Sequence, residues 1–265
     1  MSVLNRIAAS ARARVAALQA AVPLAQLQAS LPETRKPHDF AAAFRAPGYQ
    51  VIAEIKLASP SKGPIAPGLD PVAVAGDYLA HGAAALSVLT EPEFFKGDTA
   101  YLSAVRQAHP EALLLQKDFV VDAYQLYQAR VLGADACLLI VAMLTAAELQ
   151  ELYRLAVELE LTPLVEVHTA QELEQAAGLD ARLIGVNNRD LKTLTTDLDI
   201  ARRLAGLAPP AAQLICESGL SSGADLRLAR SWGYRGFLIG THLMATGEPG
   251  QALKRLLEEA NDAPA

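Results

Sequence analysis

Residues 51–62 read VIAEIKLASPSK, an apolar run that is interrupted by two charges and followed by a turn. The apolar residues indicate a strand buried on both faces, and such strands are normally almost continuously apolar. Glu54 and Lys56 break this rule, and because they are two residues apart they point to the same side of the strand. A buried ion pair, or a strand with one solvated face, explains the pattern as well as a functional site does.

Seven more apolar runs follow, separated by amphipathic segments of about 8–15 residues that are typical of helices. The eight runs are residues 51–56, 84–90, 112–117, 136–141, 163–167, 183–187, 213–217 and 236–240. Eight successive βα units predict a closed parallel barrel, because an open sheet would leave unpaired edges. A doubly wound sheet is the structural alternative. The predicted helix boundaries include N-caps at Asp70 and Thr145 and terminating glycines at Gly82, Gly133, Gly178 and Gly233, and the last helix, at about residues 248–260, is expected to start after Gly247.

The 265 residues of the chain fit one such barrel, which typically has about 250 residues. The segment before the first strand reads as two short helices divided at Pro23, followed by a short helix at about residues 39–44. This segment is too small to be a domain. We therefore predict an α/β protein, a single (β/α)8 TIM barrel (residues 49–265) with an N-terminal helical extension (residues 1–48) that covers one barrel mouth.

The composition of the chain limits which partners and which cellular compartment are expected. The net charge is −6 without a basic block, which argues against nucleic acid or an anionic membrane as a partner, so any attraction for an anionic substrate must be local. Cys137 and Cys216 lie in apolar runs and read as core residues in a reducing compartment. No signal peptide or membrane span is recognisable, so we expect a cytoplasmic protein. No metal is expected, because the histidines are scattered at His81, His109, His168 and His242.

Polar residues gather at the C-terminal ends of six of the eight predicted strands, where barrel enzymes carry their active sites. They are Glu54, Lys56, Lys117, Glu166, Asn187 with Arg189, Glu217 with Ser218 and Gly219, and Gly240 with Thr241. Two lysines and three carboxylates that converge would perturb one another's pKa values, as acid–base catalysis requires. The backbone N–H groups of Gly219 and Gly240 can surround an anion such as phosphate. His168 could reach the site, although a surface or supporting histidine is the simpler interpretation.

Several longer motifs occur in one order along the chain. They are IAEIK with ASPSKG (52–63), VLTEPEFFKGD (88–98), KDFVVDAYQ (117–125), LLIVAML (138–144), LVEVHT (164–169), GVNNRDLKT (185–193), ESGLSS (217–222) and FLIGTHLM (237–244). Together they resemble the indole-3-glycerol-phosphate synthase family over about residues 3–257. The resemblance implies ring closure of 1-(2-carboxyphenylamino)-1-deoxyribulose 5-phosphate with loss of carbon dioxide and water, a step of tryptophan biosynthesis.

The resemblance also assigns catalytic roles. Lys117 would protonate the substrate carbonyl, Glu166 and Glu54 would supply the base and a supporting carboxylate, and Lys56 is a candidate acid for dehydration. The residues implied to bind the ribulose hydroxyls and hold the lysines are Asn187 and Glu217. No cofactor is needed, because the iminium formed in the ring is itself the electron sink for decarboxylation.

Substrate contacts follow from the same resemblance. Arg189 and Ser59 would meet the anthranilate carboxylate, and Phe94 and Phe95 would wall the aromatic ring, although one of the two could simply pack its loop. The residues implied to contact the phosphate are Lys56, Ser218, Gly219, Gly240 and Thr241. The expected partner is thus a phosphorylated small molecule, and the expected assembly is a monomer or a weak homodimer.

Three positions depart from the usual family pattern, namely Leu57, Gln116 and His242, and none of them removes a proposed catalytic group. Two other functions remain open on the residues alone. A Schiff-base aldolase would also use a strand lysine beside a phosphate site. A barrel that binds a phosphorylated ligand without turning it over is the second alternative.

Overall fold

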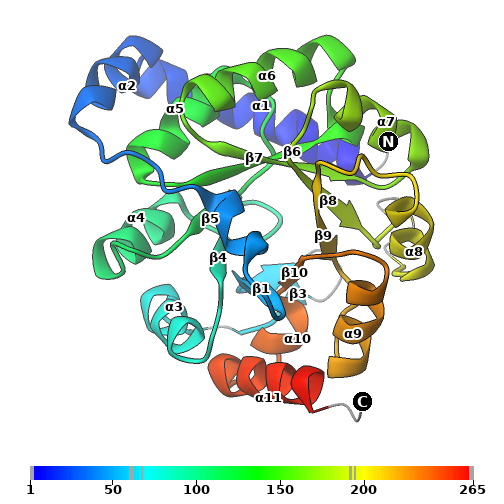
Figure 1. The fold of residues 1–265 in the computed structure, drawn as a ribbon. Coiled ribbons are helices and arrows are strands. Elements are labelled where there is room, and N and C mark those ends of the chain that lie inside the picture. Colours follow the sequence, from blue (N-terminus) through cyan, green and yellow to red (C-terminus); the bar gives the residue numbers. More distant parts are fainter. Residues whose placement is uncertain (1–2, 60–62, 67, 191–192, 194, 263–265) are drawn as a thin grey trace.

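A computed structural model of the chain describes residues 3–59, 63–66, 68–190, 193 and 195–262. Its eight parallel strands close into a barrel in the order β1-β10-β9-β8-β7-β6-β5-β4, and β4 pairs with β1 (Figure 1). The strands are β1 (Gln50–Ile55), β4 (Ala85–Leu89), β5 (Leu114–Lys117), β6 (Ala136–Ile140), β7 (Thr162–Val167), β8 (Leu183–Asn187), β9 (Gln213–Glu217) and β10 (Gly236–Ile239). Closure confirms the predicted (β/α)8 barrel and excludes the doubly wound sheet.

Helices follow the strands and form the outer layer. They are α3 (Pro71–Ala80), α4 (Thr99–Ala108), α5 (Ala123–Leu132), η3 (Val141–Met143), α6 (Ala146–Glu158), α7 (Ala170–Gly178), α8 (Asp199–Ala205), α9 (Gly223–Ser231), α10 (Thr241–Met244) and α11 (Pro249–Asn261). The predicted N-caps are confirmed: the Asp70 side chain accepts from the backbone N–H of Val72, and Thr145 forms a capping box with Glu148.

The predicted helix ends are confirmed with one exception. Gly82, Gly133 and Gly233 adopt positive φ angles after their helices, and so does Gly247 just before α11. The prediction for Gly178 was wrong, because α7 includes this residue and the left-handed conformation falls on Asp180 two positions later, with φ of 53°. Aspartate tolerates that conformation better than most residues, so the helix can end without a glycine.

A small hairpin that the sequence analysis did not predict follows the first strand. It pairs β2 (Ala58–Ser59) with β3 (Gly63–Pro64) in antiparallel orientation. The predicted turn between them includes residues 60–62, which lie outside the described residues.

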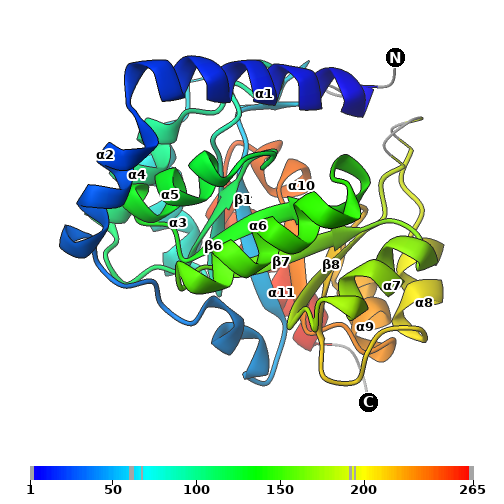
Figure 2. The ribbon, with the colours of Figure 1, turned by 90° about the horizontal axis from the view of Figure 1, so that it is seen from above.

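The N-terminal extension covers both mouths of the barrel. It consists of α1 (Val3–Ala21), α2 (Leu24–Ser30), η1 (Leu31–Glu33) and the 3-10 helix η2 (Phe40–Arg45). Phe40 and Phe44 of η2 are fully buried in one cluster with interior residues such as Leu164 of β7. Figure 2 shows α1 on the opposite side of the barrel from η2, which is the blue helix at the lower edge.

Two sequence-based expectations about this extension therefore change. The first helix is not short, because its 19 residues run without interruption to Ala21 and span about 28 Å, enough to cross a barrel mouth. The connection beyond η1 is also held to the barrel by the fully buried Asp135, which accepts hydrogen bonds from Arg35 at 2.8 Å, Arg106 at 2.5 Å and the His38 backbone N–H at 2.8 Å. The chain thus passes from one mouth to the other.

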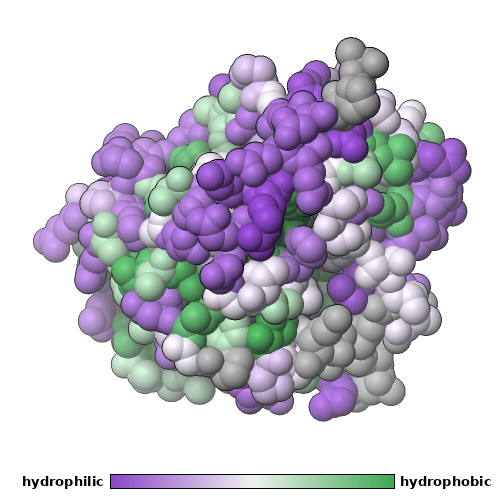
Figure 3. Space-filling model, turned by 90° about the horizontal axis from the view of Figure 1, so that it is seen from below, coloured by the Kyte–Doolittle hydropathy of each residue, from purple (hydrophilic) through white to green (hydrophobic). Residues whose placement is uncertain are grey.

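The outer face of α11 is polar. On α11, Leu253 and Leu256 are buried against the barrel, whereas Lys254, Arg255 and Glu258 are exposed. Figure 3 shows the face that includes this helix, with broad hydrophilic areas and hydrophobic residues scattered between them. Over the part of the chain that the structure describes, every helix is too short or too polar to cross a lipid bilayer.

Candidate active site

The two charges in the first strand form an ion pair inside the barrel. Glu54 is 2% exposed near the end of β1, and its carboxylate contacts the ammonium group of Lys56. Lys56 also lies over the ring of Phe95, with 5.9 Å between Nζ and the ring centroid. The ion-pair interpretation of the sequence is thus confirmed, and the pair also lines a cavity.

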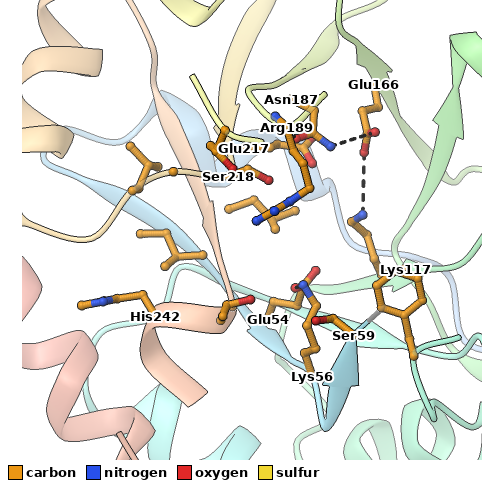
Figure 4. A pocket seen from close by; sticks show the side chains of 18 of the residues that line it. Glu54, Lys56, Ser59, Lys117, Glu166, Asn187, Arg189, Glu217, Ser218 and His242 are labelled. Atoms are coloured by element: carbon orange, nitrogen blue, oxygen red, sulfur yellow. Dashed lines mark hydrogen bonds and ion pairs between the residues drawn. The ribbon is translucent and has the colours of Figure 1, made fainter. Parts of the chain in front are cut away.

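This cavity has a volume of about 680 Å³ and opens at the C-terminal ends of the strands. Its size falls within the usual range for small-molecule sites. The predicted site residues that line it are Glu54, Lys56, Ser59, Lys117, Glu166, Asn187, Arg189, Glu217, Ser218, Gly219, Gly240 and Thr241. Figure 4 shows ten of the lining side chains with labels, arriving from several strands around the mouth.

Phe94 is the predicted site residue that the structure places elsewhere. Its ring faces the Arg6 guanidinium of α1, 5.9 Å from the ring centroid, and it is not among the residues that line the cavity. Phe95 does line the cavity, and its ring packs on Phe119 with centroids 5.7 Å apart. The two neighbouring rings contact different partners, and of the two only Phe95 lines the cavity.

Lys117, Glu166 and Asn187 form the centre of the site. The Lys117 ammonium lies 3.7 Å from Oε2 of Glu166, and Asn187 donates a hydrogen bond of 3.0 Å to Oε1 of the same carboxylate (Figure 4). These three residues come from β5, β7 and β8. Because all parallel strands end at the same mouth, residues far apart in the sequence meet here.

The buried charges shift one another's pKa values in opposite directions. Burial lowers the pKa of Lys117, but Glu166, Glu217 and Glu54 outweigh burial, so its pKa lies above the ordinary value. Burial likewise raises the pKa of Glu166, but the charge of Lys117 and the hydrogen bond from Asn187 hold it below its ordinary value. Lys117 and Glu166 are therefore both charged at neutral pH.

Glu217 behaves differently from Glu166. Its burial and the neighbouring Glu166 charge raise its pKa well above the ordinary value of 4.5, although Lys117 opposes this shift. Two carboxylates that share a dry site cannot both ionise easily, so their pKa values separate. The mouth thus holds one ionised carboxylate beside Lys117 and one that stays protonated over a wider pH range.

The turn after β9 has an unusual backbone. Ser218 and Gly219 both have positive φ angles, of 64° and 84°. Asn188 supports this turn, since its side-chain amide donates to the carbonyl groups of Glu217 at 2.9 Å and Ser218 at 3.1 Å. A left-handed serine is uncommon and such conformations cluster at functional sites. The sequence indicated the Gly-rich turn but not the conformation of Ser218.

Some lining residues were not predicted. Leu4 and Ile7 bring α1 into the cavity wall, and Phe119, Leu220 and His242 also contribute to it. The helical apolar spacing in the extension was visible in the sequence, but it did not reveal which apolar side chains would face the cavity. Among the described residues, no cluster of three or more His, Cys, Asp and Glu side chains has an arrangement that could hold a metal ion.

A closed barrel with acidic and basic side chains at its C-terminal mouth places the protein in the class of (β/α)8-barrel enzymes. Solved structures share this fold at low sequence identity. The crystal structure of 3-hexulose-6-phosphate synthase matches with 14% identity and a TM-score of 0.65, covering 79% of this chain and 99% of that chain. A mandelate oxidase mutant also matches, with 14% identity and a TM-score of 0.62 over 81% of this chain and 73% of that chain.

The sequence comparisons identify a family. The family model for indole-3-glycerol phosphate synthase matches residues 4–256. A protein with that name from Acidithiobacillus ferrooxidans is 45% identical, over 96% of this chain and 98% of its own length. One from Chromobacterium violaceum is 44% identical, over 96% and 97%. The chain belongs to the indole-3-glycerol phosphate synthase family, which confirms the resemblance found in its motifs.

Proposed function

We propose that the cavity converts 1-(2-carboxyphenylamino)-1-deoxyribulose 5-phosphate into indole-3-glycerol phosphate, carbon dioxide and water, the carboxy-lyase step of tryptophan biosynthesis. Family membership supports this reaction. The observation in the structure that supports it best is the contact between Lys117 and Glu166, two oppositely charged groups 3.7 Å apart in a cavity that is also lined by Ser218 and Gly219. This arrangement offers an acid, a base and a phosphate-binding turn in one place.

Lys117 is the proposed acid for ring closure. As the anthranilate ring carbon attacks the substrate carbonyl, the carbonyl oxygen takes a proton, and an ammonium group can supply it. The raised pKa of Lys117 keeps this group protonated. The same property disfavours the Schiff-base alternative, because imine formation requires a neutral amine.

Decarboxylation and dehydration would follow in the same cavity. The electron pair released with carbon dioxide moves into the iminium of the ring, so the step needs no cofactor. Loss of the hydroxyl group then requires an acid, for which we propose Lys56, and removal of the last proton requires a base, for which we propose Glu166 with Glu54 in support. The residues proposed to hold the ribulose hydroxyls and the lysines are Asn187 and Glu217.

The two anionic ends of the substrate would lie at different parts of the cavity. We propose that Arg189 and Ser59 bind the anthranilate carboxylate and that Phe95 walls the aromatic ring. The residues proposed to bind the phosphate are Lys56, Ser218, Gly219, Gly240 and Thr241. All of these residues line the cavity.

The direct test is to add the substrate and follow the fluorescence of the indole product. Lys117→Ala should lower kcat at least about 10²-fold, the lower range for general acid catalysis. Lys254→Ala, at an exposed position on α11, is the matched control and should leave kcat unchanged. Near-normal turnover by Lys117→Ala would contradict the assignment, whereas a borohydride-trapped adduct on Lys117 would favour the aldolase. Binding of the substrate without any product would favour the non-catalytic barrel.

We further propose that residues 1–48 and 49–265 form one structural domain, since η2 contributes Phe40 and Phe44 to the barrel core. We propose a monomer or a weak homodimer, because the exposed large apolar residues among those described lie in separate segments: Val157 on α6, Leu207 in the loop after α8 and Leu228 on α9. Analytical ultracentrifugation would test this assembly. A cytoplasmic location is supported by Cys137 and Cys216, which are buried free thiols that suit a reducing compartment.

A further inference from the structure

His168 lies between two carboxylates at the edge of the site. It follows β7 two positions after Glu166, so both side chains point to the same side of the chain. Its Nε2 atom lies 3.4 Å from Oε1 of Glu166, and its Nδ1 atom lies 3.3 Å from Oε2 of Glu172. The side chain is only 10% exposed. The imidazole ring therefore connects the proposed catalytic base with the start of α7.

The start of α7 fixes the position of this ring. Glu172 is in the first turn of the helix, and its Oε2 also accepts a hydrogen bond of 2.7 Å from the backbone N–H of His168. Its own backbone N–H donates to the Thr169 hydroxyl at 3.2 Å. Both the backbone and the Nδ1 side of His168 are thus held by one carboxylate, which leaves the ring little freedom to turn.

The other ring nitrogen has a more specific environment. Nε2 is buried and, among the described residues, has no partner that satisfies full hydrogen-bond geometry. It is close to Oε1 of Glu166, the oxygen that already accepts from Asn187. A histidine that served only to begin α7 would need its backbone and Nδ1 alone, and its Nε2 could face solvent. The burial of Nε2 beside Glu166 instead points to a role for this atom.

The charged groups around the ring favour its protonated form. Burial lowers the pKa of His168 and the positive charge of Lys117 opposes protonation, but the hydrogen bond to Glu172 and the charges of Glu166 and Glu172 outweigh both, so the pKa is raised. In return, the charge of His168 helps to lower the pKa of Glu166. An imidazolium carries N–H groups on both nitrogens, so in the protonated form each of the two ring nitrogens near a carboxylate bears a proton.

We propose, on the basis of the function proposed above, that His168 is a positioning residue, which Glu172 holds so that its Nε2 atom lies beside Oε1 of Glu166. In this position it keeps Glu166 ionised and oriented for proton removal. Glu166 is then held by Lys117 at Oε2 and by Asn187 and His168 at Oε1. His168 itself need not touch the substrate.

Two amide variants separate the roles of the two ring nitrogens. His168→Gln places an amide nitrogen near the position of Nε2 and retains a donor toward Glu166. His168→Asn places it near the position of Nδ1, so it retains a contact with Glu172 and loses the donor toward Glu166. We expect His168→Asn to lower kcat about tenfold to a hundredfold, as loss of a charged hydrogen bond predicts, with little change in KM. His168→Gln should keep most of the activity.

The pH dependence of kcat adds a readout that a merely structural role would not change. Loss of the neighbouring donor and positive charge raises the pKa of Glu166, so the acidic limb of kcat should move to higher pH in His168→Asn. Melting temperatures of both variants report on folding. Wild-type kcat and an unchanged acidic limb in His168→Asn would overturn the proposal. Equal losses of kcat in the two variants, accompanied by an equal fall in Tm, would also overturn it.

A measurement without substrate distinguishes this inference from the proposed function. In the wild-type protein, the Cε1 proton of His168, assigned by its absence in His168→Gln, should titrate above the ordinary value of 6.5, and Glu166→Gln should lower that pKa. Titration below 6.5, or no response to Glu166→Gln, would refute the positioning role while product formation stands. Titration as expected in a protein that makes no indole product would refute the proposed function alone.

Discussion

Gly185→Ala should disable the site from a position that the substrate need not touch. Gly185 lies in β8 beside the carboxylate of Glu217, and a Cβ atom there would stand 1.9 Å from Oε1 of Glu217. An ordinary contact requires at least 3.4 Å, so the carboxylate would have to move by about 1.5 Å. Leu164 offers little room for the new methyl group, because its Cδ1 would be 3.3 Å away.

The displacement allows an estimate of the loss. Misplacing a catalytic group by about 1 Å can cost about 10²-fold in rate, so we expect at least that decrease in kcat in the indole fluorescence assay. Overpacking of a core costs about 1–3 kcal/mol, which urea unfolding would measure. Gly178→Ala is the matched control, since nothing lies within 4 Å of its added Cβ at the end of α7. It should retain kcat and raise the free energy of unfolding by up to about 1 kcal/mol.

A double-mutant cycle tests the stated cause. If the clash with Glu217 accounts for the instability, Gly185→Ala should cost less free energy of unfolding in a Glu217→Ala background than in the wild type. Equal costs in the two backgrounds would show that Glu217 is not the group displaced. A Gly185→Ala enzyme with wild-type kcat and stability would refute the reasoning altogether.

Three other predictions concern charged residues. Arg189→Ala should raise KM about tenfold or more, as loss of a charged hydrogen bond predicts, and a change in kcat alone would contradict a carboxylate-binding role. Arg14 binds the buried Asp118 through two contacts of 2.5 and 3.0 Å, and Arg14→Ala removes both. It should lower the free energy of unfolding by about 2 kcal/mol, whereas Arg45→Ala, which breaks an exposed pair, should cost under about 1 kcal/mol. Glu217→Gln should raise the free energy of unfolding at pH 7. The folded protein raises the pKa of Glu217, so in the wild type this carboxyl group lowers the free energy of unfolding as the pH rises above the unfolded pKa of 4.5. The gain from the substitution should vanish below that pH.

The barrel itself was predictable because its signals are local and repeated. Strands buried on both faces give apolar runs, and the runs at 183–187 and 213–217 coincide with β8 and β9. The convergence of Glu54, Lys117 and Glu166 was also predictable, since all parallel strands of a barrel end at one mouth. These inferences need only strand identity and direction, both of which an alternating pattern of strands and helices supplies.

Features that depend on tertiary contacts were less accessible. Whether Phe94 or Phe95 faces the cavity depends on Arg6 and Phe119, which come from other parts of the chain. The path of the extension to both mouths is fixed by the burial of Phe40 and by the hydrogen bonds of Asp135, and neither is visible as a local pattern. The partners of the two phenylalanine rings and the path of the extension are therefore decided by contacts between segments that are far apart in the sequence.

The opposite pKa directions of Glu166 and Glu217 show why charge in the site could not be counted from the sequence. The mouth contains two carboxylates that each contact a lysine, Glu54 with Lys56 and Glu166 with Lys117, while Glu217 favours the protonated form. Its cations are therefore held in place before a ligand arrives, which lowers the cost of organising them around an anion. Within each pair the two charges cancel, so the local field that meets an anionic substrate in the cavity is less repulsive than the net charge of −6 of the whole chain would suggest.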